Sequence, residues 1–376
     1  MKIAIVTNSA WSAYNFRLNL AKALIKEGNE VIFIIPFNNN YSEILQEEFK
    51  CYQLFLDPKS LNPFKDLKTF FNLSKLYKKT KPDVILHFTI KLNIYGTLAA
   101  KFNKIQSLAN VTGLGTLFIR RGIATYISEF LYKISLHFSF KIFFQNKEDL
   151  NYFLNKKIIK ESNTQIIPGS GVDLRKFKLT PVDKANNKFI FLLIARLLKD
   201  KGIYEYIEAI KIVKKKFPND LIEFQLLGEA NSENKTAIGA SELRSWINDN
   251  LIKYLGTSNH VERIIAGCDC VVLPSYREGM PRSILESFAV GRPVIVSDVP
   301  GCREIVDDNI NGLLCEVKSS VDLSNKMLSM IQMSDVERFN LALNGRTKVE
   351  NLFDEEIVIS SYIKTINNIE SNEKNI

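Results

Sequence analysis

Residues 270–290 read CVVLPSYREGMPRSILESFAV, which is a short apolar run, a polar turn and an amphipathic stretch in immediate succession. The apolar run at 270–274 is too short for a helix and is typical of a buried strand. Pro281 fits the first turn of a helix, so a helix is expected over 282–290. A strand that leads directly into a helix is the building unit of a parallel sheet, because parallel neighbours are joined by crossover connections.

The same alternation continues in both directions along the chain and predicts an α/β protein made of βαβ units. Strands are expected at 2–7, 31–36, 84–87, 105–110, 141–145 and 164–167, and in a second series at 189–195, 222–227, 252–255, 270–274, 293–297 and 312–315. Helices are expected at 14–26, 67–79, 123–138, 202–216, 242–250, 261–266, 282–290, 321–333, 335–351 and 355–369. A stretch rich in Gly, Pro, Asp and Asn separates the two series, as a linker does.

We therefore expect two Rossmann-like, doubly wound parallel-sheet domains that face a cleft. The first spans 1–170, a linker spans 171–187, the second spans 188–355, and 356–376 form a C-terminal helix that can return to the first domain. Ligands of such sheets bind beyond the carboxyl ends of the strands. Functional residues are therefore expected just after strands and at helix N-termini.

The composition is that of a globular protein with unevenly distributed charge. Apolar residues make up 46% of the 376 residues, which is enough for folded cores and argues against bulk disorder. Residues 1–165 carry 23 Lys and Arg against 12 Asp and Glu, whereas residues 166–376 carry 27 against 29. The basic first part is expected to face an anionic partner, with solubility as the alternative reason for the charge.

The five cysteines are odd in number and lack C-x-x-C spacing, which suits a reducing cytoplasm better than a disulfide framework. The sequence opens on a strand pattern, KIAIV, rather than on a signal segment, and it has no run of about 18 apolar residues. No bilayer span is therefore expected. The three histidines share no metal spacing, so neither a metal site nor a catalytic histidine is expected.

The segment 274–286, PSYREGMPRSILE, offers an anion-binding site. Gly279 permits close backbone approach, and the helix-opening amides near Arg282–Ile284 suit a diphosphate together with the helix dipole. Glu286 could accept ribose hydroxyls, and Glu278 could accept a hydroxyl of a transferred sugar. The alternative is a loop with ordinary charge at the start of a helix.

A second segment, IARLLKDKG (194–202), places Arg196 directly after a strand and Lys201 directly before a helix. Two fixed cations there would stabilise the negative charge that develops on a departing diphosphate, without a metal. The alternative is a solvated pair of lysines at a helix start, which we adopt for Lys199 but not for Arg196.

Loops of the first domain carry further candidates. The loop after the first strand lacks G-x-G-x-x-G, which argues against dinucleotide binding there. Arg17, one turn into the next helix, could face the cleft, with an ordinary surface arginine as the alternative. Residues 89–96 and 112–115 each follow a strand and could shape an acceptor pocket, although Gly113 could serve a turn alone.

The stretch 115–144, GTLFIRRGIATYISEFLYKISLHFSFKIFF, combines Arg120 and Arg121 with an aromatic-rich helical pattern. Such a helix either rests on an anionic lipid surface or is a core helix with snorkelling lysines.

Three features together resemble glycosyltransferase family 4, which has the two-domain GT-B fold. They are the segment 274–286, the pair Arg196 and Lys201, and the segment GRPVIVSDVPGCREIV (291–306). The resemblance runs over nearly the whole chain. Five further segments resemble a narrower subgroup of bacterial enzymes, which extend polyprenyl-diphosphate-linked sugars. These segments are YNFR (14–17), TIKLNIYG (89–96), NVTGLG (110–115), FFQNKEDL (143–150) and IPGSGVDL (167–174).

The resemblance implies a role for each matching residue. Arg196, Lys201 and Glu278 would form the catalytic group, with the two cations on the donor diphosphate and the carboxylate on the donor sugar. The donor pocket would be completed by Gly279, Met280, Ser283, Ile284 and Glu286, the last of these on the ribose. Acceptor-binding residues are expected in the first domain at Tyr14, Asn15, Arg17, Lys91, Asn93, Gly113, Arg120 and Arg121.

The resemblance thus predicts a retaining, metal-independent glycosyltransferase without a cofactor. It would move a sugar such as GalNAc or GlcNAc from a UDP-sugar to an undecaprenyl-diphosphate-linked saccharide in surface-polysaccharide or glycan biosynthesis. It would act at the anionic inner face of the bacterial plasma membrane. The alternatives are a hexosyltransferase that uses UDP-Gal, UDP-Glc or GDP-Man and, more remotely, a nucleic-acid-binding protein, for which no recognition motif is present.

Overall fold

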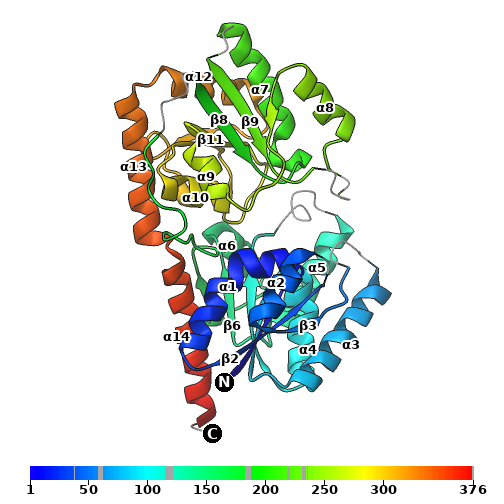
Figure 1. Ribbon diagram of the computed structural model, residues 1–376. Coiled ribbons are helices and arrows are strands. Elements are labelled where there is room, and N and C mark those ends of the chain that lie inside the picture. The colour runs from blue at the N-terminus through cyan, green and yellow to red at the C-terminus, as the bar shows by residue number, and fades with distance from the viewer. Residues whose placement is uncertain are drawn as a thin grey trace. The chain divides into compact units, whose positions relative to one another are not determined.

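The computed structural model describes residues 1–37, 39–57, 62–114, 122–182, 188–217, 221–230, 234 and 236–374 (Figure 1). The chain divides into two compact units, and each is described by itself. Unit 1 comprises Met1–Ser170 and Glu356–Ile376, and unit 2 comprises Gly171–Glu355. None of the helices within these described ranges has the length and apolar character that a membrane crossing demands.

Unit 1 is built on a parallel sheet of seven strands in the order β3-β2-β1-β4-β5-β6-β7. The central strands are continuous apolar runs because both faces of the sheet are covered. The topology reverses between β1 and β4, which are paired neighbours although β2 and β3 lie between them in the chain. The strands are β1 (Lys2–Val6), β2 (Glu30–Ile35), β3 (Lys50–Gln53), β4 (Val84–Phe88), β5 (Gln106–Val111), β6 (Lys141–Phe144) and β7 (Thr164–Ile166).

Helices cover both faces of this sheet. One face packs against α1 (Ala10–Lys26), α2 (Asn40–Glu48) and α14 (Glu355–Lys374). The C-terminal helix α14 is anchored there by Tyr362, whose hydroxyl donates to the Asn110 side chain. The other face packs against α3 (Pro63–Thr80), the π-helical turn η1 (Leu92–Gly96), α4 (Thr97–Phe102), α5 (Ile123–Leu136) and α6 (Lys147–Asn155).

Unit 2 contains a parallel sheet of six strands in the order β10-β9-β8-β11-β12-β13. Counted within the unit, this is the strand order 3-2-1-4-5-6 of a dinucleotide-binding Rossmann fold. Its topological switch point lies between β8 and β11. The strands are β8 (Phe189–Ile194), β9 (Ile222–Leu227), β10 (Lys253–Tyr254), β11 (Cys270–Leu273), β12 (Val294–Ser297) and β13 (Leu313–Cys315).

The helices of unit 2 also form two layers. One layer contains α7 (Ile203–Lys216), α8 (Ala240–Asn248) and α12 (Ser320–Gln332). The other contains α9 (Val261–Ala266), α10 (Arg282–Val290), α11 (Pro300–Ile305) and the end of α13 (Asp335–Leu352). The fold class predicted from the sequence, α/β with two doubly wound parallel sheets, is confirmed.

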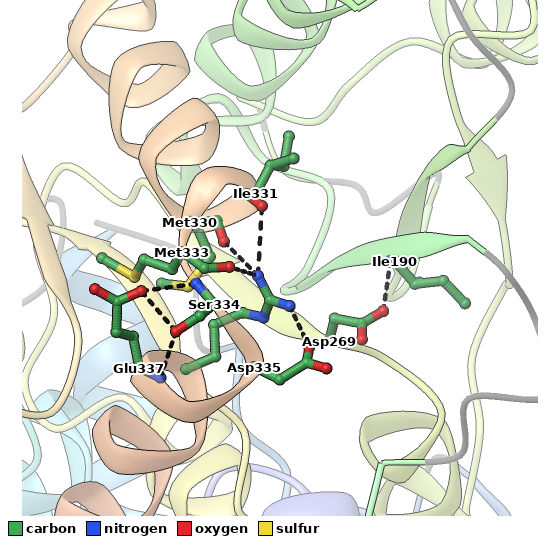
Figure 2. A network of polar contacts seen from close by, with 9 residues as sticks. Ile190, Asp269, Met330, Ile331, Met333, Ser334, Asp335 and Glu337 are labelled. Atoms are coloured by element: carbon green, nitrogen blue, oxygen red, sulfur yellow. Dashed lines mark hydrogen bonds and ion pairs between the residues drawn. The ribbon is translucent and has the colours of Figure 1, made fainter.

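A polar network holds the turn between α12 and α13 (Figure 2). Ser334 caps α13, and its backbone N–H donates to the Glu337 carboxylate over 2.7 Å. The Arg338 guanidinium donates to carbonyls at the end of α12, including Met330 over 3.2 Å, and pairs with Asp335. Arg338 also lies over the Phe189 ring of β8, so the turn is fastened to the sheet.

The segment expected as a linker is structured over its described part, 171–182. Val172 and Phe177 are buried in the core of unit 2. A Cβ on Gly171 would lie 2.4 Å from the Glu355 Cα, so this backbone packs tightly against the first residue of α14. These contacts place the division of the chain at Ser170, because the following residues belong to unit 2.

Candidate active site

The two segments singled out in the second domain come together at the switch point of unit 2. Residues 195–201 follow β8, and residues 274–281 follow β11, its direct neighbour in the sheet. Since parallel strands end at the same edge, both loops lie at the position where doubly wound sheets bind ligands. The Tyr276 N–H donates to the Asp200 carbonyl over 2.9 Å, which joins the two loops directly.

Close backbone packing holds the loops against each other. Gly202 adopts φ +71°, and a Cβ there would lie 2.0 Å from the Pro274 carbonyl oxygen. Gly301, at the start of α11, approaches the loop from β12, and a Cβ there would lie 2.3 Å from the Gly279 carbonyl oxygen. Side chains at these positions would displace the loop, so both glycines determine where Glu278 and Gly279 lie.

Lys201 and Glu278 form an ion pair across the two loops, with 2.6 Å between Nζ and Oε1. Their side chains are only 19% and 13% exposed, so the pair is partly shielded from water. Arg196 is exposed beyond the end of β8 and forms no ion pair with another described residue. The site therefore offers one uncommitted cation, and a second cation that is balanced by a carboxylate.

Helix α10 begins without a side-chain cap and without an acidic residue in its first turn. Its N-terminus therefore keeps the partial positive charge that favours an anion. Ser283 is half-buried in this first turn. Ile284 is fully buried, and its N–H already donates to the Pro281 carbonyl over 3.1 Å, so its part in a donor pocket is limited to supporting the helix start.

Glu286 lies one turn further along α10 and pairs with Arg282, with 2.8 Å between Nε and Oε1. Burial raises the pKa of Glu286 above its ordinary value of 4.5, although the charges of Arg282 and Lys176 oppose the rise. Glu262 adds a second carboxylate to this neighbourhood. A shielded carboxylate held by one guanidinium is suited to accept hydroxyl groups.

Among the residues expected to bind an acceptor, Tyr14, Asn15 and Arg17 follow β1 and Lys91 and Asn93 follow β4, on the two strands of the switch point of unit 1. The Arg17 guanidinium is buried and lies 3.9 Å from the centre of the Phe88 ring. Lys91 pairs with Asp66 over 2.6 Å, and both side chains are 13% exposed. This pair offsets the charge of Lys91, which was expected to help bind the acceptor.

Other expected acceptor residues have local partners. Asn93 is fully buried and exchanges two hydrogen bonds with the backbone of Asn110, over 2.7 and 3.1 Å, which favours a supporting role. The Asn15 side chain donates to the Trp11 carbonyl over 3.0 Å. Tyr14 packs against Tyr41, and Gly113 adopts φ 115° in a turn. Arg120 and Arg121 lie outside the described residues.

Comparisons with known proteins identify the family of the chain. A family described as "Glycosyl transferase 4-like" matches residues 2–146, and one described as "Glycosyl transferases group 1" matches residues 175–347. The N,N'-diacetylbacillosaminyl-diphospho-undecaprenol alpha-1,3-N-acetylgalactosaminyltransferase of Campylobacter jejuni is 32% identical over 99% of this chain and 100% of its own. The chain is a family 4 glycosyltransferase.

Further relatives of the glycosyltransferase support the same assignment. The Escherichia coli UDP-Gal:alpha-D-GlcNAc-diphosphoundecaprenol alpha-1,3-galactosyltransferase is 26% identical over 79% of this chain and 78% of its own. The crystal structure of Anabaena HepE in complex with UDP and glucose has a TM-score of 0.81 and 19% identity, and it covers 98% of this chain and 100% of its own. At that identity the likeness shows the GT-B fold alone. The predicted family, enzyme class and fold are confirmed.

The structure adds residues that the sequence did not single out. Tyr276 stabilises the loop that follows β11, because its hydroxyl donates to Glu205 over 2.6 Å and its ring lies under the Lys318 ammonium. Ser275 is fully buried at the end of β11, and its hydroxyl has no hydrogen-bond partner among the described residues. Ser275 stands inside PSYREG, so its place after a strand is the one signal that could have drawn attention to it.

Proposed function

We propose that this glycosyltransferase transfers an N-acetylhexosamine, such as GalNAc or GlcNAc, from a UDP-sugar to an undecaprenyl-diphosphate-linked saccharide. The convergence of the β8 and β11 loops carries this proposal, because it gathers Arg196, Lys201 and the start of α10 at one switch point. The name of the Campylobacter jejuni relative supports the class of acceptor and the type of sugar. Biosynthesis of a surface polysaccharide or another glycan at the inner face of the plasma membrane follows from that acceptor.

Unit 2 holds the donor in this proposal. The diphosphate takes the place of the Glu278 carboxylate as the partner of Lys201 and recruits Arg196, while Glu278 turns to a hydroxyl of the sugar. Glu286 accepts the ribose hydroxyls. Charge-assisted hydrogen bonds of this kind are the stronger ones in proteins, and they gain strength as the leaving diphosphate acquires charge.

The transfer proceeds with retention of anomeric configuration and without a metal. The bond between the sugar C1 and the diphosphate oxygen breaks, and the acceptor hydroxyl oxygen bonds to C1 on the same face. The hydroxyl proton passes to the departing diphosphate, so the leaving group serves as the base. The protein contributes cations and amides that are already in position, which is the effective form of electrostatic catalysis.

Product analysis tests the proposal. The purified protein is incubated with UDP-GalNAc, UDP-GlcNAc, UDP-Gal, UDP-Glc or GDP-Man and a lipid extract that contains undecaprenyl-diphosphate-linked sugars, with and without EDTA. We expect an N-acetylhexosamine mass increment, an α-linkage in the NMR spectrum and full activity in EDTA. A hexose increment would support the hexosyltransferase instead, a function favoured by the galactosyltransferase relative from Escherichia coli.

A further inference from the structure

Helix α5 of unit 1 turns its apolar side chains outward. Its buried residues are Thr125, Tyr132, Ser135 and Leu136. The exposed positions recur every three to four residues and carry large apolar side chains, at Ile123, Tyr126, Ile127, Phe130 and Ile134. Phe130 is 64% exposed and Ile123 is 80% exposed. A core helix would bury this stripe, so the core interpretation of the aromatic-rich stretch does not hold for α5.

Neighbouring helices extend the apolar stripe. The helices α3, α4 and α5 pack next to one another on the same side of the sheet (Figure 1). Phe64, Leu67 and Phe71 form a second exposed stripe on α3. Phe102 of α4 is 73% exposed and touches Phe70 of α3, while the Lys101 ammonium lies over the Phe138 ring just after α5. We call the outer surface of α3, α4 and α5 the apolar face.

The exposed charged side chains of α3, α4 and α5 are lysines, and one of them, Lys65, pairs with Asp57 before α3. Exposed lysines stand at 65, 68, 75, 78, 79, 101 and 133. The described parts of α3, α4 and α5 contain two carboxylates, Asp66 and Glu129, and both are shielded, at 13% and 14% exposure, and paired with lysines. A helix with large apolar side chains flanked by cations is the pattern of an interfacial membrane helix.

A cationic cavity opens beside the C-terminal half of α5. Its volume is about 550 Å³, and its lining includes Lys133, His137, Lys157 and Lys160. No carboxylate is among the described residues that line it. Lys133, on the exposed side of α5, and His137, directly after the helix, both line this cavity, so the apolar face and the cavity are continuous.

We infer that the apolar face docks on an anionic phospholipid bilayer. Helix α5 lies in the headgroup layer with Ile123, Ile127 and Phe130 toward the acyl chains, and the cavity receives a lipid phosphate. Charge selects this occupant over a second copy of the chain, because two such faces would place lysines against lysines. The surface is carried by unit 1 alone, while its use in meeting a lipid-linked acceptor rests on the proposed function.

Vesicle flotation tests the inference with the full chain. Vesicles of phosphatidylcholine are compared with vesicles that contain 30% phosphatidylglycerol. We expect binding to the anionic vesicles alone, weakened by salt. Phe130→Glu should lower the partition coefficient about tenfold or more, because it removes a large apolar side chain from the bilayer and sets a carboxylate against anionic headgroups. Phe339→Glu is the matched control, because Phe339 is 60% exposed on α13 of unit 2.

A second pair of variants tests the cavity. Lys157→Glu with Lys160→Glu should abolish the preference for anionic vesicles, whereas Lys215→Glu with Lys216→Glu on α7 should leave it unchanged. Equal binding to both kinds of vesicle, or equal behaviour of Phe130→Glu and Phe339→Glu, would overturn the inference. So would a dimer, seen by light scattering, that Phe130→Glu dissociates.

An activity measurement separates this inference from the proposed function. With a short-chain acceptor in detergent, Phe130→Glu should turn over at the wild-type rate, while with acceptor in anionic vesicles it should be about tenfold slower. Vesicle binding without transfer to any lipid-linked sugar would leave the docking surface standing and would refute the proposed function. Equal loss of both activities in Phe130→Glu would overturn the docking role.

Discussion

Replacing Gly301 with alanine should damage the donor loop without touching a side chain in it. A Cβ at this position would lie 2.3 Å from the Gly279 carbonyl oxygen and 2.8 Å from that of Glu278, whereas ordinary contact begins near 3.4 Å. The loop must therefore retreat by about 1.1 Å, the difference between 3.4 and 2.3 Å. The φ of Gly301 lies outside the left-handed region, so the effect is steric and not due to backbone strain.

Two magnitudes follow for this variant. Overpacking of this kind costs about 1–3 kcal/mol of unfolding free energy. A displacement of about 1 Å in the groups that position a substrate lowers kcat/KM by about 100-fold. Urea unfolding and initial-rate kinetics with varied nucleotide sugar measure the two effects.

The matched control for Gly301→Ala is Gly267→Ala. Gly267 has an ordinary φ of −86°, and a Cβ there would meet its nearest atoms at 3.6 and 3.7 Å. This variant should keep both its stability and its activity. If Gly301→Ala is as active as Gly267→Ala, the reasoning that places Glu278 and Gly279 at the donor is refuted.

Further predictions concern the ion pairs and buried groups. Lys201→Ala should lower the unfolding free energy more than the double variant Lys201→Ala, Glu278→Gln does, because the single change leaves a shielded carboxylate without its cation. A double-mutant cycle in urea measures the coupling between the two residues, and additive effects would contradict the prediction. Glu286→Gln should raise the unfolding free energy above that of the wild type at pH 8 but not below pH 4.5. A carboxyl group whose pKa is raised on folding makes the folded protein less stable as the pH rises, and glutamine removes this cost. Identical pH profiles would count against the prediction, and transfer activity should be lost. Burial lowers the pKa of His87 from 6.5 to about 3, so the unfolding free energy of the wild type should fall by about 1.4 kcal/mol per pH unit between these two pH values. His87→Gln should flatten this slope in urea unfolding, and an unchanged slope would contradict the prediction. Arg338→Ala should lower the melting temperature while kcat/KM stays at the wild-type value, since the guanidinium holds the α12–α13 turn; altered KM would contradict a purely structural role.

The strands were predictable where they are buried. Parallel strands covered on both faces are continuous apolar runs, so β1, β8 and β11 were located to within a residue or two. The strand β3, KCYQ, was missed because it is a short edge strand with exposed ends and no apolar run. The helices α2, α4, α6 and α11 were missed as well. Of these, α11 spans six residues, too few to show a period.

The meeting of the two proposed donor-binding segments at one sheet edge was predictable, but the ion pair between them was not. Segments that follow the strands of a parallel sheet lie at one edge of that sheet. The sequence analysis could therefore assign Arg196 and Glu278 to the same site. The contact between Lys201 and Glu278 requires β8 and β11 to be neighbours in the sheet. The two residues are 77 positions apart in the sequence, and the sequence pattern does not reveal the order of the strands. The approach of Gly301 to Gly279 likewise arises from packing between loops.

The most direct test of the central claim is the affinity for UDP, measured by isothermal titration calorimetry. The loops after β8 and β11 are claimed to hold the diphosphate through Arg196 and Lys201. The double variant Arg196→Ala, Lys201→Ala should bind UDP about 100-fold or more weakly, since each charged hydrogen bond is worth about 1.5–3 kcal/mol. The control Lys215→Ala, Lys216→Ala should bind as the wild type does. Equal affinity in the two double variants would contradict the claim.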